Sequence, residues 1–154
     1  LSAAGPASPL GPEKGSAEWR NAGRLYLLLA LAQAAHSIEE MLTRLYDFFW
    51  TATGVFHQYI PAFPQFRMQA ETFGALNMTF IAVLLALAPT VAARKPWALV
   101  FAGVVAVIEI LNGTGHLAGT VVFGGYVPGA ATAPFLLVFG ILTLRALRQA
   151  PPRA

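Results

Sequence analysis

Four long runs of residues with almost no charge constrain the fold of this sequence more than any other feature. They occupy approximately residues 25–45, 72–93, 97–117 and 128–147. Each run is close to the roughly 20 residues that a helix needs to cross a hydrocarbon core. Of the 17 charged residues (10 Lys or Arg and 7 Asp or Glu), all but three lie at the ends of these runs or outside them, and the exceptions are Glu39, Glu40 and Glu109. The sequence therefore predicts an all-α polytopic membrane protein, a four-transmembrane-helix bundle.

The composition excludes several other classes of protein. Charged residues make up 11% of the chain and hydrophobic residues 56%, whereas soluble domains carry about 25% charged residues. An ordinary soluble enzyme and a disordered chain are therefore excluded. The sequence has no Cys, which excludes disulfides, thiol nucleophiles and thiolate metal sites. The net charge of +3 is small and is better explained by membrane topology than by a nucleic-acid partner.

The ends of the chain and one connection differ from the apolar runs. Residues 1–18 are rich in Pro, Ala and Gly, which predicts a flexible tail, and residues 149–154 predict a short polar tail. The transmembrane domain then covers residues 19–148, with an aromatic outer loop at about 48–70. This loop is either an interfacial aromatic belt or a lid over an apolar substrate, and the two interpretations are compatible.

The distribution of basic residues predicts the orientation. With four spans, the side that holds both termini and the second connection carries eight Lys and Arg residues, and the other side carries Arg44 and Arg67. Because cytoplasmic segments are enriched in Lys and Arg, we expect both termini to be cytoplasmic and the protein to be integral to the cell (inner) membrane.

Two of the predicted helices carry a polar stripe. At 100° per residue, one face of the first helix holds Gln33, His36, Glu40, Thr43 and Asp47. One face of the third helix holds Glu109, Asn112, Gly113, His116 and Thr120. Three unpaired Glu within spans would cost roughly 8–10 kcal/mol. We expect the two stripes to face each other in the outer half of the membrane, where a metal ion, protonation of the carboxyls or a water-filled cavity would lower this cost.

Three short motifs on these segments resemble those of the HXXEE-motif integral membrane proteins, a bacterial family of uncharacterised function. His36-Ser37-Ile38-Glu39-Glu40 matches the namesake motif, Asn112 to His116 resembles an NxxxH motif, and Pro128 to Thr132 a PGxxT motif. The resemblance covers about residues 24–147. It implies a membrane protein whose polar motifs gather at one site, and it supplies no established reaction.

The leading hypothesis is a metal-dependent enzyme, a hydrolase or an oxidoreductase, that acts on an apolar or lipid-like substrate. Imidazole and carboxylate are ligands for Zn or non-haem Fe, and the expected ligands of this divalent metal ion are His36, Glu40, Glu109 and His116. The expected catalytic residues are Glu39, as general base or partner of a ligand, Asn112 and Thr132. Two further residues are secondary candidates, Glu71 and His57.

Two alternatives stay open on the sequence alone. One is a metal-free isomerase or cyclase in which a protonated Glu acts as the acid. The other is a non-enzymatic carrier or proton pathway, although the inner half of every predicted helix lacks ionisable residues. The expected partners are membrane lipids and an apolar or lipid substrate, with no nucleic acid, and the sequence allows a homo-oligomer.

Overall fold

The computed structural model describes residues 12–149 as five α-helices, with no strand in that range. The helices are α1 (Pro12–Leu42), α2 (Leu45–Tyr59), α3 (Ala70–Ala92), α4 (Pro96–Val122) and α5 (Ala133–Gln149). The all-α class predicted from the sequence is therefore confirmed. Residues 1–11 of the expected first tail and 150–154 of the expected last tail lie outside the described residues.

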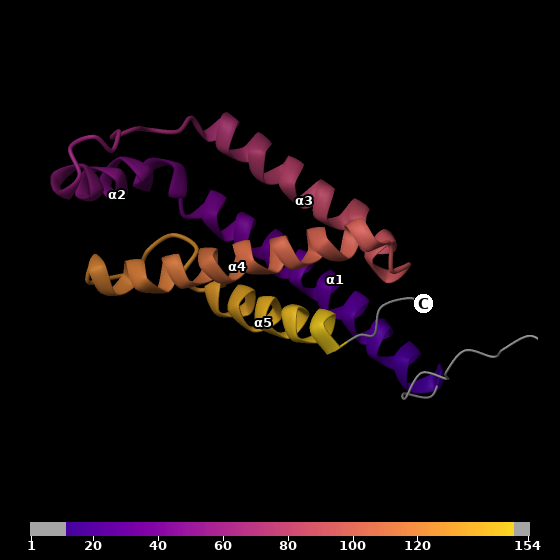
Figure 1. Cartoon of the computed structure of the whole chain (residues 1–154). Helices are drawn as coiled ribbons and strands as arrows, with labels where there is room; N and C mark the ends of the chain where they lie inside the picture. Colours follow the sequence, from indigo (N-terminus) through magenta and orange to yellow (C-terminus); the bar gives the residue numbers. More distant parts are fainter. Residues whose placement is uncertain (1–11, 150–154) are drawn as a thin grey trace, which may run out of the picture.

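Four of the helices form an elongated bundle with two distinct ends. The start of α1, the α3–α4 connection and the end of α5 lie at one end, and α2 and the α4–α5 connection lie at the other (Figure 1). The first end carries most of the basic residues in the described range, namely Arg20, Arg24, Arg94, Lys95, Arg145 and Arg148. The Lys and Arg residues from which the topology was predicted are thus mostly at one end of the bundle.

Two helix boundaries are set by residues in the left-handed region. Arg44 has a φ of 62° and separates α1 from α2, and its guanidinium lies 2.7 Å from the Asp47 carboxylate. Arg94 has a φ of 60° after α3, and Pro96 then starts α4 at the position where its missing N–H is not needed.

Three expected boundaries need correction. Residues 12–18, expected in the flexible tail, are the first residues of α1. The outer segment 48–70 is mostly the helix α2 rather than a loop, because its apolar residues recur at helical spacing and its prolines come only after Tyr59. The fourth apolar run becomes helical only at Ala133, so residues 128–132 form a turn.

The helix α5 packs closely against α4 and α1. A Cβ on Gly113 would lie 2.8 Å from the Ala133 carbonyl oxygen, and one on Gly140 would lie 3.0 Å from the Ala106 carbonyl oxygen. Small residues permit this close approach of α4 and α5. At the basic end, Tyr26 is fully buried and donates a hydrogen bond of 3.1 Å to the Leu84 carbonyl, which joins α1 to α3.

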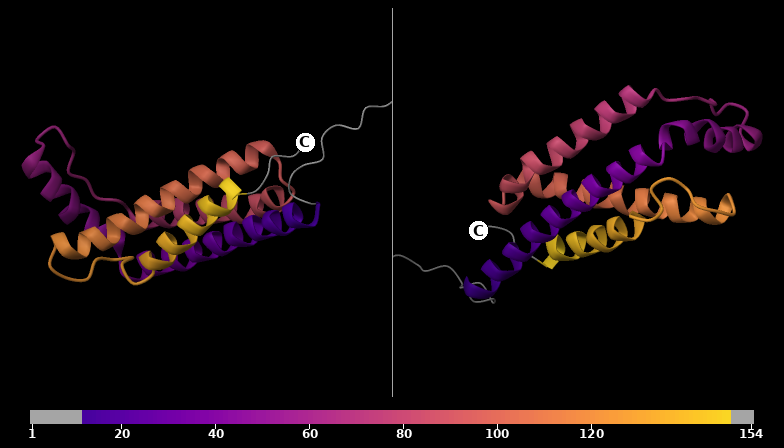
Figure 2. Two further views of the ribbon diagram at one scale, coloured as in Figure 1. Left: turned by 60° about the horizontal axis from the view of Figure 1, so that its bottom comes forward. Right: turned by 180° about the vertical axis from the view of Figure 1, so that it is seen from behind.

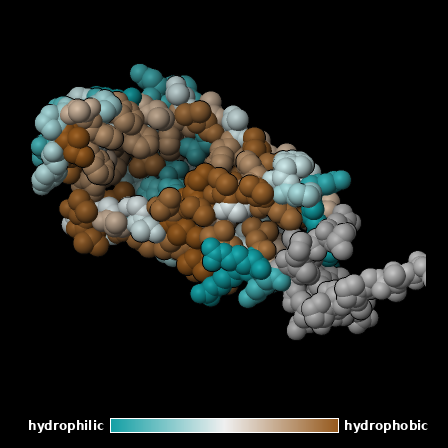
Figure 3. Space-filling view, in the orientation of Figure 1, coloured by the Kyte–Doolittle hydropathy of each residue, from teal (hydrophilic) through white to brown (hydrophobic). Residues whose placement is uncertain are grey.

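Two described helices, α3 and α4, are long and apolar enough to cross a membrane. Only 17% of the apolar segment of α3 and 33% of that of α4 is buried in the protein. Their outward faces are therefore largely apolar, and hydrophobic residues dominate much of the surface seen in Figure 3. A helix in the core of a soluble protein would be mostly buried, so this pattern weakly favours membrane association.

Candidate metal centre

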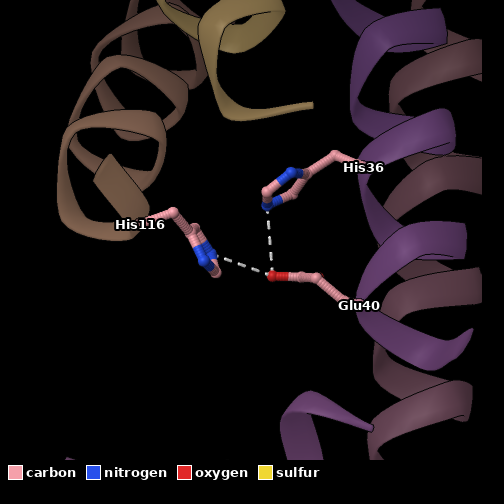
Figure 4. Close-up of side chains that lie close together, drawn as sticks. All are labelled: His36, Glu40 and His116. Carbon is pink, nitrogen blue, oxygen red and sulfur yellow. Dashed lines mark ion pairs between the residues drawn. The ribbon is translucent and has the colours of Figure 1, made fainter. Parts of the chain in front are cut away.

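Three side chains from α1 and α4 converge at one point inside the bundle (Figure 4). The Oε1 atom of Glu40 lies 3.2 Å from Nε2 of His36 and 3.2 Å from Nε2 of His116. All three residues are buried, and one candidate ligand atom from each lies within 4.8 Å of the other two. His36 and Glu40 meet because positions i and i+4 share a helix face, and the two imidazole rings are 4.7 Å apart in an edge-to-face arrangement.

Behind His36, the Thr132 hydroxyl links the imidazole to the Glu39 carboxylate. Nδ1 of His36 lies 2.8 Å from Oγ1 of Thr132, and that hydroxyl lies 2.5 Å from Oε2 of Glu39. A hydroxyl has one hydrogen and an ionised carboxylate only accepts. The Thr132 hydroxyl therefore donates to Glu39 and accepts from Nδ1–H of His36. This places the proton of the neutral imidazole on Nδ1 and leaves a lone pair on Nε2.

That lone pair faces another acceptor. Nε2 of His36 is buried and has no hydrogen-bond partner among the described residues, and Oε1 of Glu40 lies 3.2 Å from it. Two acceptors at 3.2 Å repel each other unless a proton or a cation lies between them. A hydrogen-bonded partner that fixes the far nitrogen of a ligating imidazole is also a usual feature of metal sites. The arrangement thus has the chemistry of a cation site.

The distances from Glu40 to the two imidazoles agree with metal coordination. Two ligand atoms about 2.0–2.1 Å from a tetrahedral ion lie about 3.3 Å from each other. Each of the two distances from Oε1 of Glu40 is 3.2 Å. A His₂Glu set is one of the ligand sets of catalytic zinc, which keeps a fourth position open.

Glu39 points away from this group and holds the turn before α5. Its carboxylate accepts hydrogen bonds from the backbone N–H groups of Ala131 (3.0 Å) and Thr132 (2.8 Å), from the Thr132 hydroxyl and from the Tyr126 hydroxyl. Partial burial and this bond to Glu39 raise the pKa of Tyr126, so its phenol remains a donor. With four donors on it, Glu39 is not free to act as a general base, and its geometry is that of a partner that orients His36.

The turn passes against both imidazole rings at Gly129. This residue has a φ of 90°, and a Cβ there would lie 2.7 Å from Cε1 of His116 and 2.8 Å from Cε1 of His36. Only a glycine combines this backbone conformation with so close an approach. The turn therefore covers one side of the three ligands.

A cavity of about 870 Å³ opens on the other side of the ligands. Glu40 and His116 lie in its wall together with Gln33, Asn77 and Asn112, and the remaining wall is apolar and largely aromatic. Figure 3 shows a hollow in this face with hydrophilic residues inside and hydrophobic residues around it. Gln33, Ser37 and Asn77 form a hydrogen-bonded chain that joins α1 to α3 beside the cavity.

The structure separates the remaining expected site residues from the three ligands. Glu109 is fully buried but does not belong to the group, because seven residues along α4 place it about 10 Å from the level of His116. The assignment of Glu109 as a ligand is therefore corrected. Glu71 is exposed in the first turn of α3. His57 is exposed on α2, and its Nδ1 lies 2.8 Å from the Phe63 carbonyl.

Two functional features were not found from the sequence. Tyr126 follows two glycines in a turn and carries no periodic signal, so its bond to Glu39 depends on how the α4–α5 connection folds back. In the sequence Gly129 is only part of a motif, although a Cβ at this position would lie within 2.8 Å of both imidazoles. The Pro-Gly pair at residues 128–129 is typical of a turn with positive φ. It does not predict that this turn contacts the two imidazoles.

Comparison with known proteins agrees with the motif. The model of a family described as "Protein of unknown function with HXXEE motif" matches residues 27–143, and the chain belongs to this family. Neither a curated protein nor a solved structure matches the chain. The matched region contains all three converging side chains and the turn that holds them.

Proposed function

We propose that this HXXEE-motif protein is a membrane-embedded enzyme that binds a divalent metal ion, most simply Zn²⁺, through His36, Glu40 and His116. Its substrate would be an apolar, lipid-like molecule that occupies the adjoining cavity. The observation that carries the proposal is that the Nε2 atoms of two buried imidazoles each lie 3.2 Å from one carboxylate oxygen beside an apolar cavity.

The proposed four-span arrangement rests on the outward faces of four helices. Large apolar side chains are exposed on each of them, for example Leu31 (50%) on α1, Leu76 (58%) on α3, Val100 (69%) on α4 and Phe135 (56%) on α5. Such a surface is unfavourable in water and suits a lipid environment. Among the described helices only α3 and α4 satisfy the length and hydropathy test on their own. The acidic motif interrupts the apolar run of α1, and α5 has only 17 residues.

The chemistry proposed for the site is metal-assisted hydrolysis. A zinc ion with three protein ligands lowers the pKa of its bound water to about 7 and polarises a carbonyl group. Glu40 and His116 line the cavity, so an open position on the ion would face a substrate there. Asn112 lies in the same wall and is suited to orient that substrate through its amide.

The proposal is tested by elemental analysis of the detergent-purified protein. We expect stoichiometric metal in the wild type and in His57→Ala, which removes an exposed imidazole outside the group. We expect its loss in His36→Ala and in His116→Ala, with the helical content unchanged by circular dichroism. Equal metal content in all four proteins would contradict the proposal.

One observation favours the metal-free alternative, an acid–base isomerase. Glu109 is fully buried with the uncharged amide of Asn112 beside its carboxyl group, and a charged carboxylate in that state is very costly. A neutral Glu109 would be an acid in the core. Once an activity is known, its survival after chelation together with its loss in Glu109→Gln would select this alternative.

A further inference from the structure

The helix α2 turns a continuous apolar stripe toward the cavity. The stripe consists of Leu45, Phe48, Phe49, Ala52, Val55, Phe56 and Tyr59. These positions repeat at i, i+3, i+4 and i+7, which is one face of a helix, and they extend over about 21 Å at 1.5 Å per residue. Such a face normally packs against protein, whereas here it borders about 870 Å³ of space.

The polar residues of the cavity wall come from other helices and are all uncharged or acidic, apart from one imidazole. They lie on α1, α3 and α4 and are Gln33, Glu40, Asn77, Asn112 and His116, and no Lys or Arg of the described residues lines the cavity. In the protein alone, before any metal ion is bound, a phosphate or carboxylate buried there would have no positively charged side chain as a partner. Amide groups and a carboxylate instead suit a hydroxyl, which both donates and accepts.

We infer that the cavity holds an uncharged long-chain lipid with a terminal hydroxyl, a fatty alcohol in the simplest case. Its chain lies along the apolar stripe of α2, and its hydroxyl lies against Asn77, Asn112 and Glu40. The inference deepens the proposed function by naming the class of its substrate. It rests on the proposed function in one respect, namely that the bound alcohol is a substrate. Binding of the alcohol itself requires only the cavity wall.

The cavity is placed for access from the side of the bundle. Its wall includes Phe73, Asn77 and Phe80 of α3 and Leu111, Asn112 and Gly115 of α4. These helices diverge from their connecting turn in both views from front and back (Figures 1 and 2). In a bilayer, a lipid would reach the cavity between the two helices without crossing water.

Two glycines of α4 provide a matched pair of variants. Gly115 lines the cavity, and a Cβ there would meet no atom within 4 Å. Gly103 likewise has no atom within 4 Å of a Cβ, but it does not line the cavity. Gly115→Leu should therefore place a side chain in the cavity without a clash at its Cβ, and Gly103→Leu controls for the same change in size and helix propensity.

The test is photo-crosslinking of the full chain in detergent with diazirine-bearing hexadecanol, and with hexadecanoic acid and lysophosphatidylcholine that carry the same group. We expect hexadecanol to label peptides of α2 and α4, and labelling to fall about tenfold in Gly115→Leu but not in Gly103→Leu. Equal labelling of the two variants would overturn the cavity assignment. Stronger labelling by the acid or the phospholipid would overturn the uncharged class.

Metal content measured on the same samples separates this inference from the proposed function. Hexadecanol labelling should persist in His36→Ala, because that variant retains the cavity wall. If the wild type holds no metal and is still labelled, the metal site fails while the lipid assignment stands. If it holds metal and is not labelled at the cavity, the lipid assignment fails alone.

Discussion

Replacement of Gly129 by Ala tests the metal centre without changing any ligand. A Cβ at this position would lie 2.7 Å from Cε1 of His116 and 2.8 Å from both Nδ1 of His116 and Cε1 of His36. Ordinary contacts of a Cβ begin at 3.4 Å, so relief of these contacts requires shifts of about 0.6 Å in the rings or the turn. A functional site tolerates displacements of its side chains of about 0.5 Å, and metal–ligand distances tolerate deviations of about 0.2 Å.

The same substitution at Gly124 provides the control. Gly124 has a φ of 66°, but a Cβ there meets nothing within 4 Å. Both variants therefore carry the backbone cost of a left-handed Ala, about 1–2 kcal/mol, and only Gly129→Ala disturbs the imidazoles. The difference between them isolates the contribution of the contact with His36 and His116.

The expected difference is large enough to measure by thermal unfolding with and without Zn²⁺. At a metal concentration 100 times the Kd, binding stabilises the folded state by about 2.7 kcal/mol, which raises the Tm by roughly 5–10 °C. Gly124→Ala should keep this increment. If the affinity of Gly129→Ala falls about 100-fold, its increment is about 0.4 kcal/mol. Equal increments in the two variants would refute the placement of both rings against the turn.

Three further predictions concern the motif and the topology. Glu40→Gln should abolish metal binding, while Glu39→Gln should retain the metal with about 10–100-fold weaker affinity, both measured by metal titration; the opposite order would exchange their roles. Thr132→Val should weaken the metal affinity by a similar factor, because it removes the hydroxyl between Glu39 and His36. A membrane-impermeant thiol reagent should label Gln58→Cys from outside intact cells and should label Lys95→Cys only after lysis, and the reverse pattern would invert the topology.

The sequence predicted the ligand pair on α1 because helix periodicity is local. His36 and Glu40 share a face whatever the rest of the chain does, and His116 followed from the second polar stripe. Glu109 belongs to that same stripe, so periodicity alone could not separate it from His116. Glu109 and His116 differ in their position along the axis of α4. Which of them lies level with His36 and Glu40 depends on how α1 is shifted along its axis relative to α4, and the sequence does not give that shift.

The hydrogen bonds of Glu39 could not be predicted because they depend on long-range folding. They come from a turn more than 80 residues away, whose N–H groups and hydroxyls converge on one carboxylate. The helix α2 is a different case, because its apolar residues have helical spacing. Its aromatic content and the prolines that follow it favoured a loop, although the local signal for a helix was present.

The three converging side chains lie between a closely packed side of the bundle and a side that contains a cavity. On the first side, Gly113 brings α4 against α5, and the turn held by Glu39 fixes His36. On the second side, α2, α3 and α4 surround a cavity. A preorganised ligand set needs rigid support, whereas an apolar chain needs space that can adapt. Glu40 and His116 lie between the two sides and line the cavity, which is where the proposed chemistry on an apolar substrate would require them.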